Sequence, residues 1–170
     1  MRVSGAMAAG VVAGGCCLVL AGCATPVAAP VVPLLAASAP APVAGYDWFY
    51  HADAEQASLA YGLKDSDDLR LGLACSQGDG KLELSATAPT GVREIRLESG
   101  GDTETFAAEG EPSQLHEGDF LTAESKTNTP VFQRFRRIGW MAQWHGDRRE
   151  TYVAHAATGS DIERFFAFCG

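Results

Sequence analysis

Strict alternation of apolar and polar residues is the feature that most constrains the fold of this chain. Its clearest instance is KLELSATA at residues 81–88, where Leu and Ala alternate with Lys, Glu, Ser and Thr. Successive side chains of a β-strand point to opposite faces, so the pattern predicts a strand with one apolar and one solvated face. Strands of this kind are typical of antiparallel sheets, because parallel sheets are buried on both faces.

The same alternation recurs along most of the chain from Tyr46 onwards. Segments rich in Gly, Asp and Ser separate the alternating stretches: DSDD at 65–68, QGDG at 77–80, SGGD at 99–102 and HGDR at 145–148. These residue types favour tight turns, so the sequence predicts a series of hairpins. We expect Leu73 and Trp140 to be buried and residues 109–119 to form a loop.

Residues 129–139 change to a helical period. Thr129 is a candidate cap, Pro130 suits the first helical position, and Gly139 suits the exit from a helix. The segment therefore predicts a short helix.

A second helix is predicted at the C-terminal end of the sequence. Ser160 and Glu163 fit a capping box. The apolar residues that follow are spaced as one helical face: Ile162, Phe165, Phe166 and Cys169. We therefore expect an α+β fold, mainly antiparallel sheet in a sandwich-like or partly closed barrel arrangement, with two short helices, the last at the C-terminus.

The first 46 residues carry a single charge, on Arg2. The uncharged run that follows ends at the tetrapeptide Leu20-Ala21-Gly22-Cys23. A short positive start, an apolar run of this length and small residues before a cleavage point are typical of a secretory signal peptide.

The tetrapeptide resembles the lipobox of bacterial lipoproteins, residue for residue. The resemblance implies that residues 1–22 are a signal peptide that is removed, that diacylglycerol is attached to the Cys23 sulfur, and that fatty acids such as palmitate acylate the protein there. The alternative is a transmembrane anchor, because residues 3–24 are uncharged and about 20 such residues span a bilayer. The many small residues in this run and the prolines that follow it count against the anchor.

Residues 23–44 are expected to be the lipidated cysteine and a disordered, Pro/Ala-rich tether. Pro-rich segments run extended at about 3.1 Å per residue, so this tether would reach about 60 Å. Ala24 stands where, in lipoproteins similar to the enterobacterial kind, Asp favours retention in the inner membrane. The resemblance therefore implies a lipid-anchored protein of the cell membrane, in the outer membrane and facing the periplasm.

We expect residues 45–170 to form a single globular domain of ordinary size. Without the signal peptide the chain has 12 basic and 21 acidic residues, a net charge of −9. The acidic excess lies in residues 45–125, whereas residues 126–170 are slightly basic. An acidic total argues against nucleic acid as a partner.

Removal of the signal peptide and acylation of Cys23 would leave two cysteines, Cys75 and Cys169. In an oxidising periplasm such a pair is most simply a disulfide. Two buried free thiols or a zinc site are the alternatives, but neither cysteine has a second Cys or a His within four residues, as the short local spacings of zinc ligands require.

Candidate chemistry is sparse, and we expect no metal and no cofactor. His51 and Asp53 share a strand face and would need a third ligand to bind zinc. The DSDDL segment resembles the start of a calcium loop but has Arg70 at the sixth position and Ser76 at the twelfth. An enzyme is the less favoured hypothesis. A small periplasmic hydrolase would draw on a set of residues in two loops: His116, Glu117, Asp119, His145 and Asp147.

Five arginines in the last third of the chain form a candidate anion-binding patch: Arg134, Arg136, Arg137, Arg148 and Arg149. Its ligand would be a lipid phosphate or an acidic cell-wall group, and its alternative is a solvated basic face. We expect an envelope-anchored periplasmic lipoprotein whose domain has a non-enzymatic binding or structural role, with the membrane as partner through Cys23 and an envelope protein or an anionic cell-wall or lipid component as a further partner.

In outline the chain also resembles the small periplasmic lipoproteins that inhibit C-type lysozymes. Their inhibitory loop has a run like Ser-Gly-x-Gly-Ala-Arg, and the nearest segment here is LESGGDTE at residues 97–104, which lacks the Ala-Arg. A lysozyme-inhibitor-like protein is therefore a second alternative, and no residue role is carried over from that family.

Overall fold

The computed structural model describes residues 39–115 and 117–170. Six strands form one sheet, here called the large sheet, in the order β1-β2-β3-β4-β8-β7. Their bounds are β1 (Tyr46–Ala52), β2 (Gln56–Leu63), β3 (Leu69–Ser76), β4 (Lys81–Ala88), β8 (Asp119–Lys126) and β7 (Glu109–Pro112). Every strand pair in it is antiparallel.

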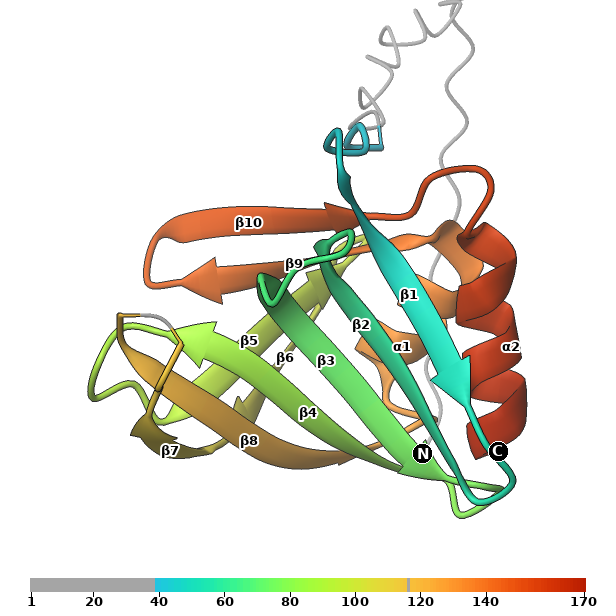
Figure 1. The fold of residues 1–170 in the computed structure, drawn as a ribbon, viewed down its shortest axis with the longest axis horizontal. Helices are drawn as coiled ribbons and strands as arrows, with labels where there is room; N and C mark the ends of the chain where they lie inside the picture. Colours follow the sequence, from blue (N-terminus) through green and yellow to red (C-terminus); the bar gives the residue numbers. More distant parts are fainter. Residues whose placement is uncertain (1–38, 116) are drawn as a thin grey trace, which may run out of the picture. The chain divides into compact units, whose positions relative to one another are not determined.

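Four further strands form the small sheet, in the order β10-β9-β5-β6, again antiparallel throughout. Their bounds are β10 (Arg148–Val153), β9 (Trp140–His145), β5 (Glu94–Ser99) and β6 (Asp102–Ala107), and the helices are α1 (Pro130–Ile138) and α2 (Gly159–Cys169). In Figure 1 the strands β5 and β6 and the helix α1 lie behind the large sheet. The α+β prediction with a C-terminal helix is confirmed, and the two sheets are open rather than closed into a barrel.

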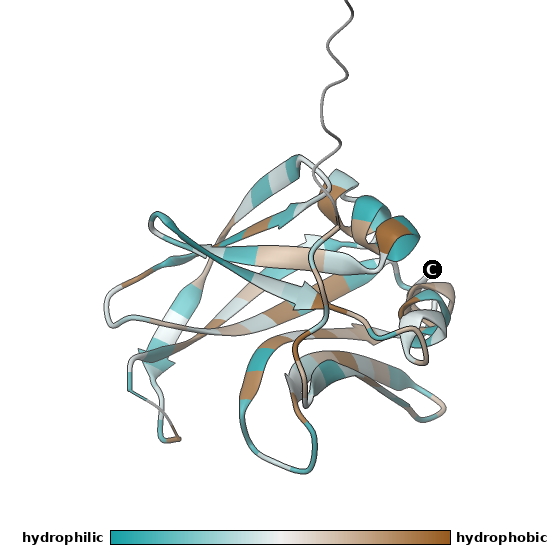
Figure 2. Ribbon diagram, turned by 90° about the horizontal axis from the view of Figure 1, so that it is seen from above, coloured by the Kyte–Doolittle hydropathy of each residue, from teal (hydrophilic) through white to brown (hydrophobic). Residues whose placement is uncertain are grey.

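The alternating pattern places one face of each strand in the core. Along β4 the four apolar side chains are buried, while Lys81 and Glu83 on the opposite face are exposed. Hydrophobic and hydrophilic residues alternate in the same way along the strands in Figure 2. The inner face of the large sheet is therefore apolar, as predicted, whereas the outer side of β4 is polar.

The two helices supply aromatic side chains to this inner face. α2 lies against β1 and β2, and α1 lies against β5, β6 and β9. Phe132 and Phe135 of α1 and Phe165 and Phe166 of α2 are fully buried. The rings of Phe135 and Trp48 lie 4.7 Å apart between centroids. Each such buried aromatic side chain stabilises the fold by about 1.5–3 kcal/mol of apolar burial.

α1 begins and ends at the residues that the sequence predicted. Gly139 adopts φ 73°, the left-handed conformation that glycine tolerates, and its N–H donates to the Phe135 carbonyl at 2.8 Å. Thr129 is the N-cap residue, but its hydroxyl makes no cap hydrogen bond and lies 3.2 Å from the Ser125 hydroxyl.

The capping box predicted for α2 is wrong. The helix begins at Gly159 with Thr158 as its N-cap residue, two positions before the predicted N-cap Ser160. The Thr158 hydroxyl donates to Asp47 of β1 at 2.6 Å, and the Glu163 carboxylate pairs with Arg136 of α1. Contacts with other elements therefore use the side chains that a local cap would need.

The predicted pairing of Cys75 and Cys169 is present as a disulfide between β3 and α2, with the Cα atoms 5.7 Å apart. Both cysteines lie on core-facing positions. The bond joins residues 94 positions apart and fastens the C-terminal helix to the large sheet.

Two further expectations are corrected. Residues 109–119 are not all loop, because Glu109–Pro112 form the edge strand β7 beside β8. Trp140 is half-buried rather than buried, because β9 points Met141 and Gln143 inward. Gln143 remains in the core because its side-chain oxygen accepts a hydrogen bond from the Tyr152 hydroxyl at 3.1 Å.

The predicted signal peptide, Cys23 and residues 24–38 of the predicted tether lie outside the described residues. Within the described part of the chain no helix is long and apolar enough to cross a membrane. Among the described residues the first strand begins at Tyr46, close to the predicted start of the globular domain.

Candidate functional site

Small side chains form the centre of the outer face of the large sheet. Ser58 of β2 is paired with Ala74 of β3, and in the next outward-facing row Ala60 is paired with Gly72. Gly72 is paired on its other side with Ser85 of β4. A Cβ atom at Gly72 would collide with the Ser85 hydroxyl, so glycine lets these strands pack without a side chain above the sheet.

Three adjoining hollows follow this row of small residues across the face. A hollow of about 390 Å³ near the β1–β2 and β3–β4 turns shares Ser58 and Ala74 with a central hollow of about 260 Å³. The central hollow in turn shares Arg70 and Thr87 with one of about 760 Å³ beside the β9–β10 hairpin. Together they make one groove, here called the sheet groove, within the 300–1,000 Å³ range of ligand pockets at each end.

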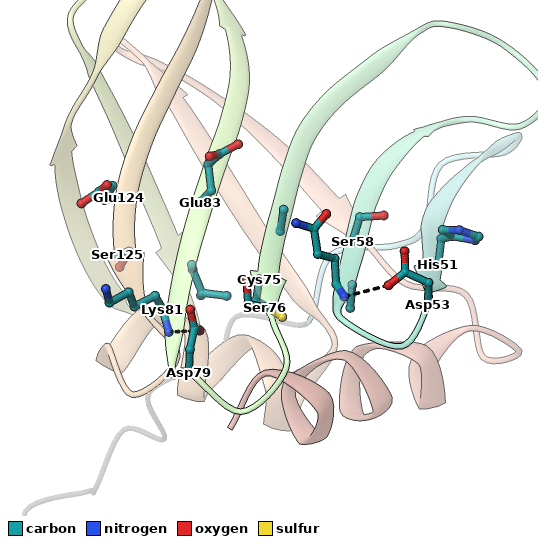
Figure 3. Close-up of a pocket in the computed structure, with 14 residues that line it drawn as sticks. His51, Asp53, Ser58, Cys75, Ser76, Asp79, Lys81, Glu83, Glu124 and Ser125 are labelled. Atoms are coloured by element: carbon teal, nitrogen blue, oxygen red, sulfur yellow. Dashed lines mark hydrogen bonds between the residues drawn. The ribbon is translucent and has the colours of Figure 1, made fainter.

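Acidic side chains surround the first hollow (Figure 3). Its charged residues and its histidine come from three strands and two turns: His51, Asp53, Asp79, Lys81, Glu83 and Glu124. Asp53 and Asp79 stabilise the turns, because Asp53 accepts the backbone N–H of Gln56 at 2.9 Å and Asp79 accepts that of Lys81 at 2.8 Å. Backbone N–H donors also lower the pKa of Asp53 below its usual value. The Asp53 carboxylate therefore stays ionised at neutral pH.

His51 and Asp53 both line this hollow, as their spacing predicted. No third ligand joins them: the described residues include no group of three or more His, Cys, Asp and Glu side chains placed to hold a metal ion.

The hollow beside the β9–β10 hairpin contains His145. His145 is 11 % exposed, and its Nε2 lies 3.7 Å from a Glu150 carboxylate oxygen. Burial lowers the pKa of His145 below its usual value, against the opposing effect of Glu150. On the same wall Arg70 pairs with Asp68 at 2.9 Å. At neutral pH the His145 imidazole is therefore uncharged.

The residues of the alternative hydrolase are brought together only in part. Glu117 and His145 line the same hollow. Asp119 is buried elsewhere, where it accepts hydrogen bonds from Arg93 at 2.7 Å and from the Gly91 N–H at 3.1 Å. Asp147 is exposed in the hairpin turn, and His116 lies outside the described residues. No hydrogen bond joins any two of those that are described, so no acid–base pair is assembled there.

The five arginines of the predicted patch lie on two elements, three on α1 and two on β10. Four of them pair with carboxylates: Arg134 with Asp102, Arg136 with Glu163, Arg148 with Glu150 and Arg149 with Glu98. Among the described residues Arg137 is the one member of the five without an ion pair. An anionic ligand would therefore have to displace carboxylates from most of this set.

A further cluster of charged and aromatic side chains, which the sequence did not predict, lies on the outer face of the small sheet. The Glu98 carboxylate accepts hydrogen bonds from Arg149 at 2.9 Å and from the Trp144 indole at 3.0 Å. The guanidinium of Arg149 lies 5.2 Å from the centroid of Trp140, and that of Arg96 lies 5.3 Å from the centroid of Trp144. Trp140 and Trp144 alternate along β9 and were a signal for this cluster, but Trp140 was predicted to be buried.

The two halves of the domain differ in net charge. The large sheet with its turns, residues 46–88 and 109–126, has 13 acidic and 4 basic side chains, a net of −9. The remaining residues, 89–108 and 127–170, have 8 of each. In the described structure two of those 13 acids make an ion pair with Arg or Lys, against five of the 8. Six of the 13 acids line the sheet groove, and the negative charge of the domain is therefore concentrated, and largely without ion pairs, in the half that carries the groove.

No family model, no curated protein and no solved structure matches this chain.

Proposed function

We propose that this chain is an envelope-anchored lipoprotein whose globular domain binds a partner protein in the periplasm and carries out no catalysis of its own. The lipobox Leu20-Ala21-Gly22-Cys23 after an uncharged run supports the anchor. Several acyl chains on one residue hold a protein durably at a membrane, whereas one chain does so only marginally. The Pro-rich segment after Cys23 would let the domain reach a partner about 60 Å from the lipid surface.

A binding role is supported above all by the unpaired acidic residues around the sheet groove. Net charge far from zero keeps a surface soluble, and one-sided charge along a hollow also attracts partners of the opposite sign. The arginines of α1 and β10 give less support to an anionic partner, since most of them already have carboxylate partners.

The anchor is tested by metabolic labelling with a fatty acid in bacteria that express the chain with its own leader. We expect label in the wild type and none in Cys23→Ser, and we expect the labelled protein to fractionate with the outer membrane. Equal labelling of both proteins would contradict lipidation. Fractionation of the labelled protein with the inner membrane would contradict the sorting proposal alone.

The binding role is tested by crosslinking in the same cells, followed by identification of the captured proteins. We expect a reproducible envelope protein that is captured less efficiently by Cys23→Ser, because the unlipidated domain is no longer held near it. Turnover of a cell-wall substrate by the purified protein, with no partner captured, would contradict the proposal.

A further inference from the structure

We propose that the sheet groove docks an extended, lysine- or arginine-bearing segment of a partner protein. This inference rests on the proposed binding function and names the surface and the chemistry of its partner. Docking of such a segment requires three things of the groove. Its carboxylates must not already be paired with cations, its shape must fit a polypeptide, and its charge must disfavour a second copy of this chain.

The charge requirement is met by an opposed pair of glutamates. Glu83 of β4 and Glu124 of β8 are direct cross-strand partners, both exposed, and neither makes an ion pair in the described structure. Like charges placed directly opposite each other on a sheet destabilise it. A cation from a partner would relieve this repulsion, whereas an anion would increase it.

Lysines next to this pair do not cancel it. Lys81 and Lys126 are also direct cross-strand partners, one row beyond the glutamates, so the two rows have opposite signs. The first hollow still has four carboxylates against one lysine, because Asp53 and Asp79 lie at its rim. A basic segment that lies along the groove would therefore meet net negative charge at this end.

The groove suits a chain rather than a single small cation. It runs from the β1–β2 turn to the β9–β10 hairpin through three hollows, over a floor with no large side chain at Ser58, Ala74 or Gly72. Phe120 borders the central hollow and is 38 % exposed. An exposed phenylalanine face can contact the aliphatic stem of Lys or Arg and attract its cationic end.

A second copy of the chain does not fit the same surface. A two-fold dimer through this face would oppose two surfaces that each carry the excess of acidic residues described above. Like-charge juxtaposition of this kind costs binding free energy and suppresses self-association.

The first test is fluorescence anisotropy with a labelled peptide of alternating Lys and Thr, about ten residues long, and the purified full chain at low ionic strength. We expect binding that weakens at least about fivefold in Glu83→Gln/Glu124→Gln, from the energies of exposed ion pairs. The matched control is Glu94→Gln/Glu104→Gln, which removes two carboxylates of the small sheet that line none of the three hollows, and it should bind as the wild type does.

Three results of this test would overturn the proposal. The first is no binding of the Lys/Thr peptide. The second is equal weakening by the control variant, which would mean that net charge alone attracts the peptide. The third is full displacement of the peptide by spermidine at equal concentration of charge, which would indicate a small-cation site. Folding of the Gln variant is confirmed by an unchanged or raised midpoint in urea, since its substitutions remove repulsion.

The second test separates this inference from the proposed function. A photo-crosslinking amino acid is placed at Ala74 in the groove, or at Thr105 on the small sheet, in the chain expressed in cells. We expect capture from Ala74 but not Thr105, a Lys- or Arg-bearing segment at the crosslink, and loss of capture in the double Gln variant. Capture of a partner only from Thr105 would overturn docking in the groove but leave the proposed binding function standing. Capture of a second copy of the chain from Ala74 would also overturn docking of a partner in the groove. If neither site captures a protein, both the groove proposal and the binding function are contradicted.

Discussion

The large and the small sheet differ in how the charges on their outer faces are neutralised. On the small sheet, Glu98 is surrounded by Arg149 and the Trp144 indole, and the tryptophan rings are covered by guanidinium groups. On the large sheet, Glu83 faces Glu124 over a floor of small side chains. The first face is satisfied within the molecule, and the second is not.

This difference indicates which face contributes to stability and which is available for binding. Hydrogen bonds to a charged, partly buried group stabilise a fold more than exposed charges do. A face with unpaired like charges lowers stability, and such a feature is commonly found where a protein gives up stability for function. The following substitutions test this division, starting with the bond that fastens α2 to the large sheet.

The largest effect is expected for loss of the disulfide. Cys169→Ala should lower the free energy of unfolding by about 2–4 kcal/mol, because the closed loop restricts the unfolded chain. α2 should loosen first, since a helix of this length is marginal without tertiary contacts. Urea unfolding of the oxidised protein measures the loss, and hydrogen exchange locates it. Reduction of the wild type should reproduce the variant; two alkylatable thiols in untreated protein would contradict the bond.

The next effect sharpens the contrast between the two faces. Glu98→Ala should lower the free energy of unfolding by about 1–2 kcal/mol, because Arg149 and the Trp144 indole lose their shared acceptor. Glu83→Ala, the matched change on the large sheet, should alter it by less than about 0.5 kcal/mol. Urea midpoints of the two variants measure the difference, and equal losses would remove the distinction between the sheets.

A smaller change in stability is expected from protonation of His145, in the hollow beside the β9–β10 hairpin. The pKa of His145 is lower in the folded protein than its usual value, so the unfolded chain binds the proton more readily. Stability should therefore fall as the pH drops below about 6.5, by less than about 1 kcal/mol down to pH 5.5. Urea midpoints between pH 7.5 and 5.5 measure this slope, and His145→Gln should flatten it. An unchanged slope in the variant would assign it to other groups.

Glutamates that pair with arginines, Glu98 and Glu163, should affect the stability of the protein at lower pH than His145 does. Arg149 lowers the pKa of Glu98, and Arg136 lowers that of Glu163. Each contributes stability above its unfolded pKa, about 4.3, and the contribution is lost as the pH falls through the lower folded value. Acid unfolding of Glu98→Gln should therefore be less steep below pH 4 than that of the wild type. Identical acid transitions would contradict this assignment.

The smallest effect has the opposite sign. Glu83→Gln should raise the free energy of unfolding by about 0.2–0.5 kcal/mol at low salt, because it removes repulsion across the β4–β8 pair. The gain should vanish near 1 M salt, where charges are screened over about 3 Å. Urea midpoints at the two salt concentrations measure the change, with Glu94→Gln as the control. Destabilisation by Glu83→Gln at low salt would mean that this glutamate is paired in solution.

The sequence by itself determined that the strands are antiparallel, where most turns and both helices lie, and that the two cysteines face the core. It could do so because apolar–polar alternation, turn residues and helical spacing are local properties. It also predicted the inward residues of β4 and the stripe of α2, and these are confirmed. Only the tertiary structure decided which face of β9 is buried, because Met141 packs in the core there and Gln143 finds Tyr152 as a partner. The same holds for the cap of α2, for the ion pairs that occupy four of the five arginines, and for the alignment of Ser58, Ala74 and Glu83 that forms the groove. Each of these depends on which strands and helices become neighbours, and that is set by long-range packing that no local pattern encodes.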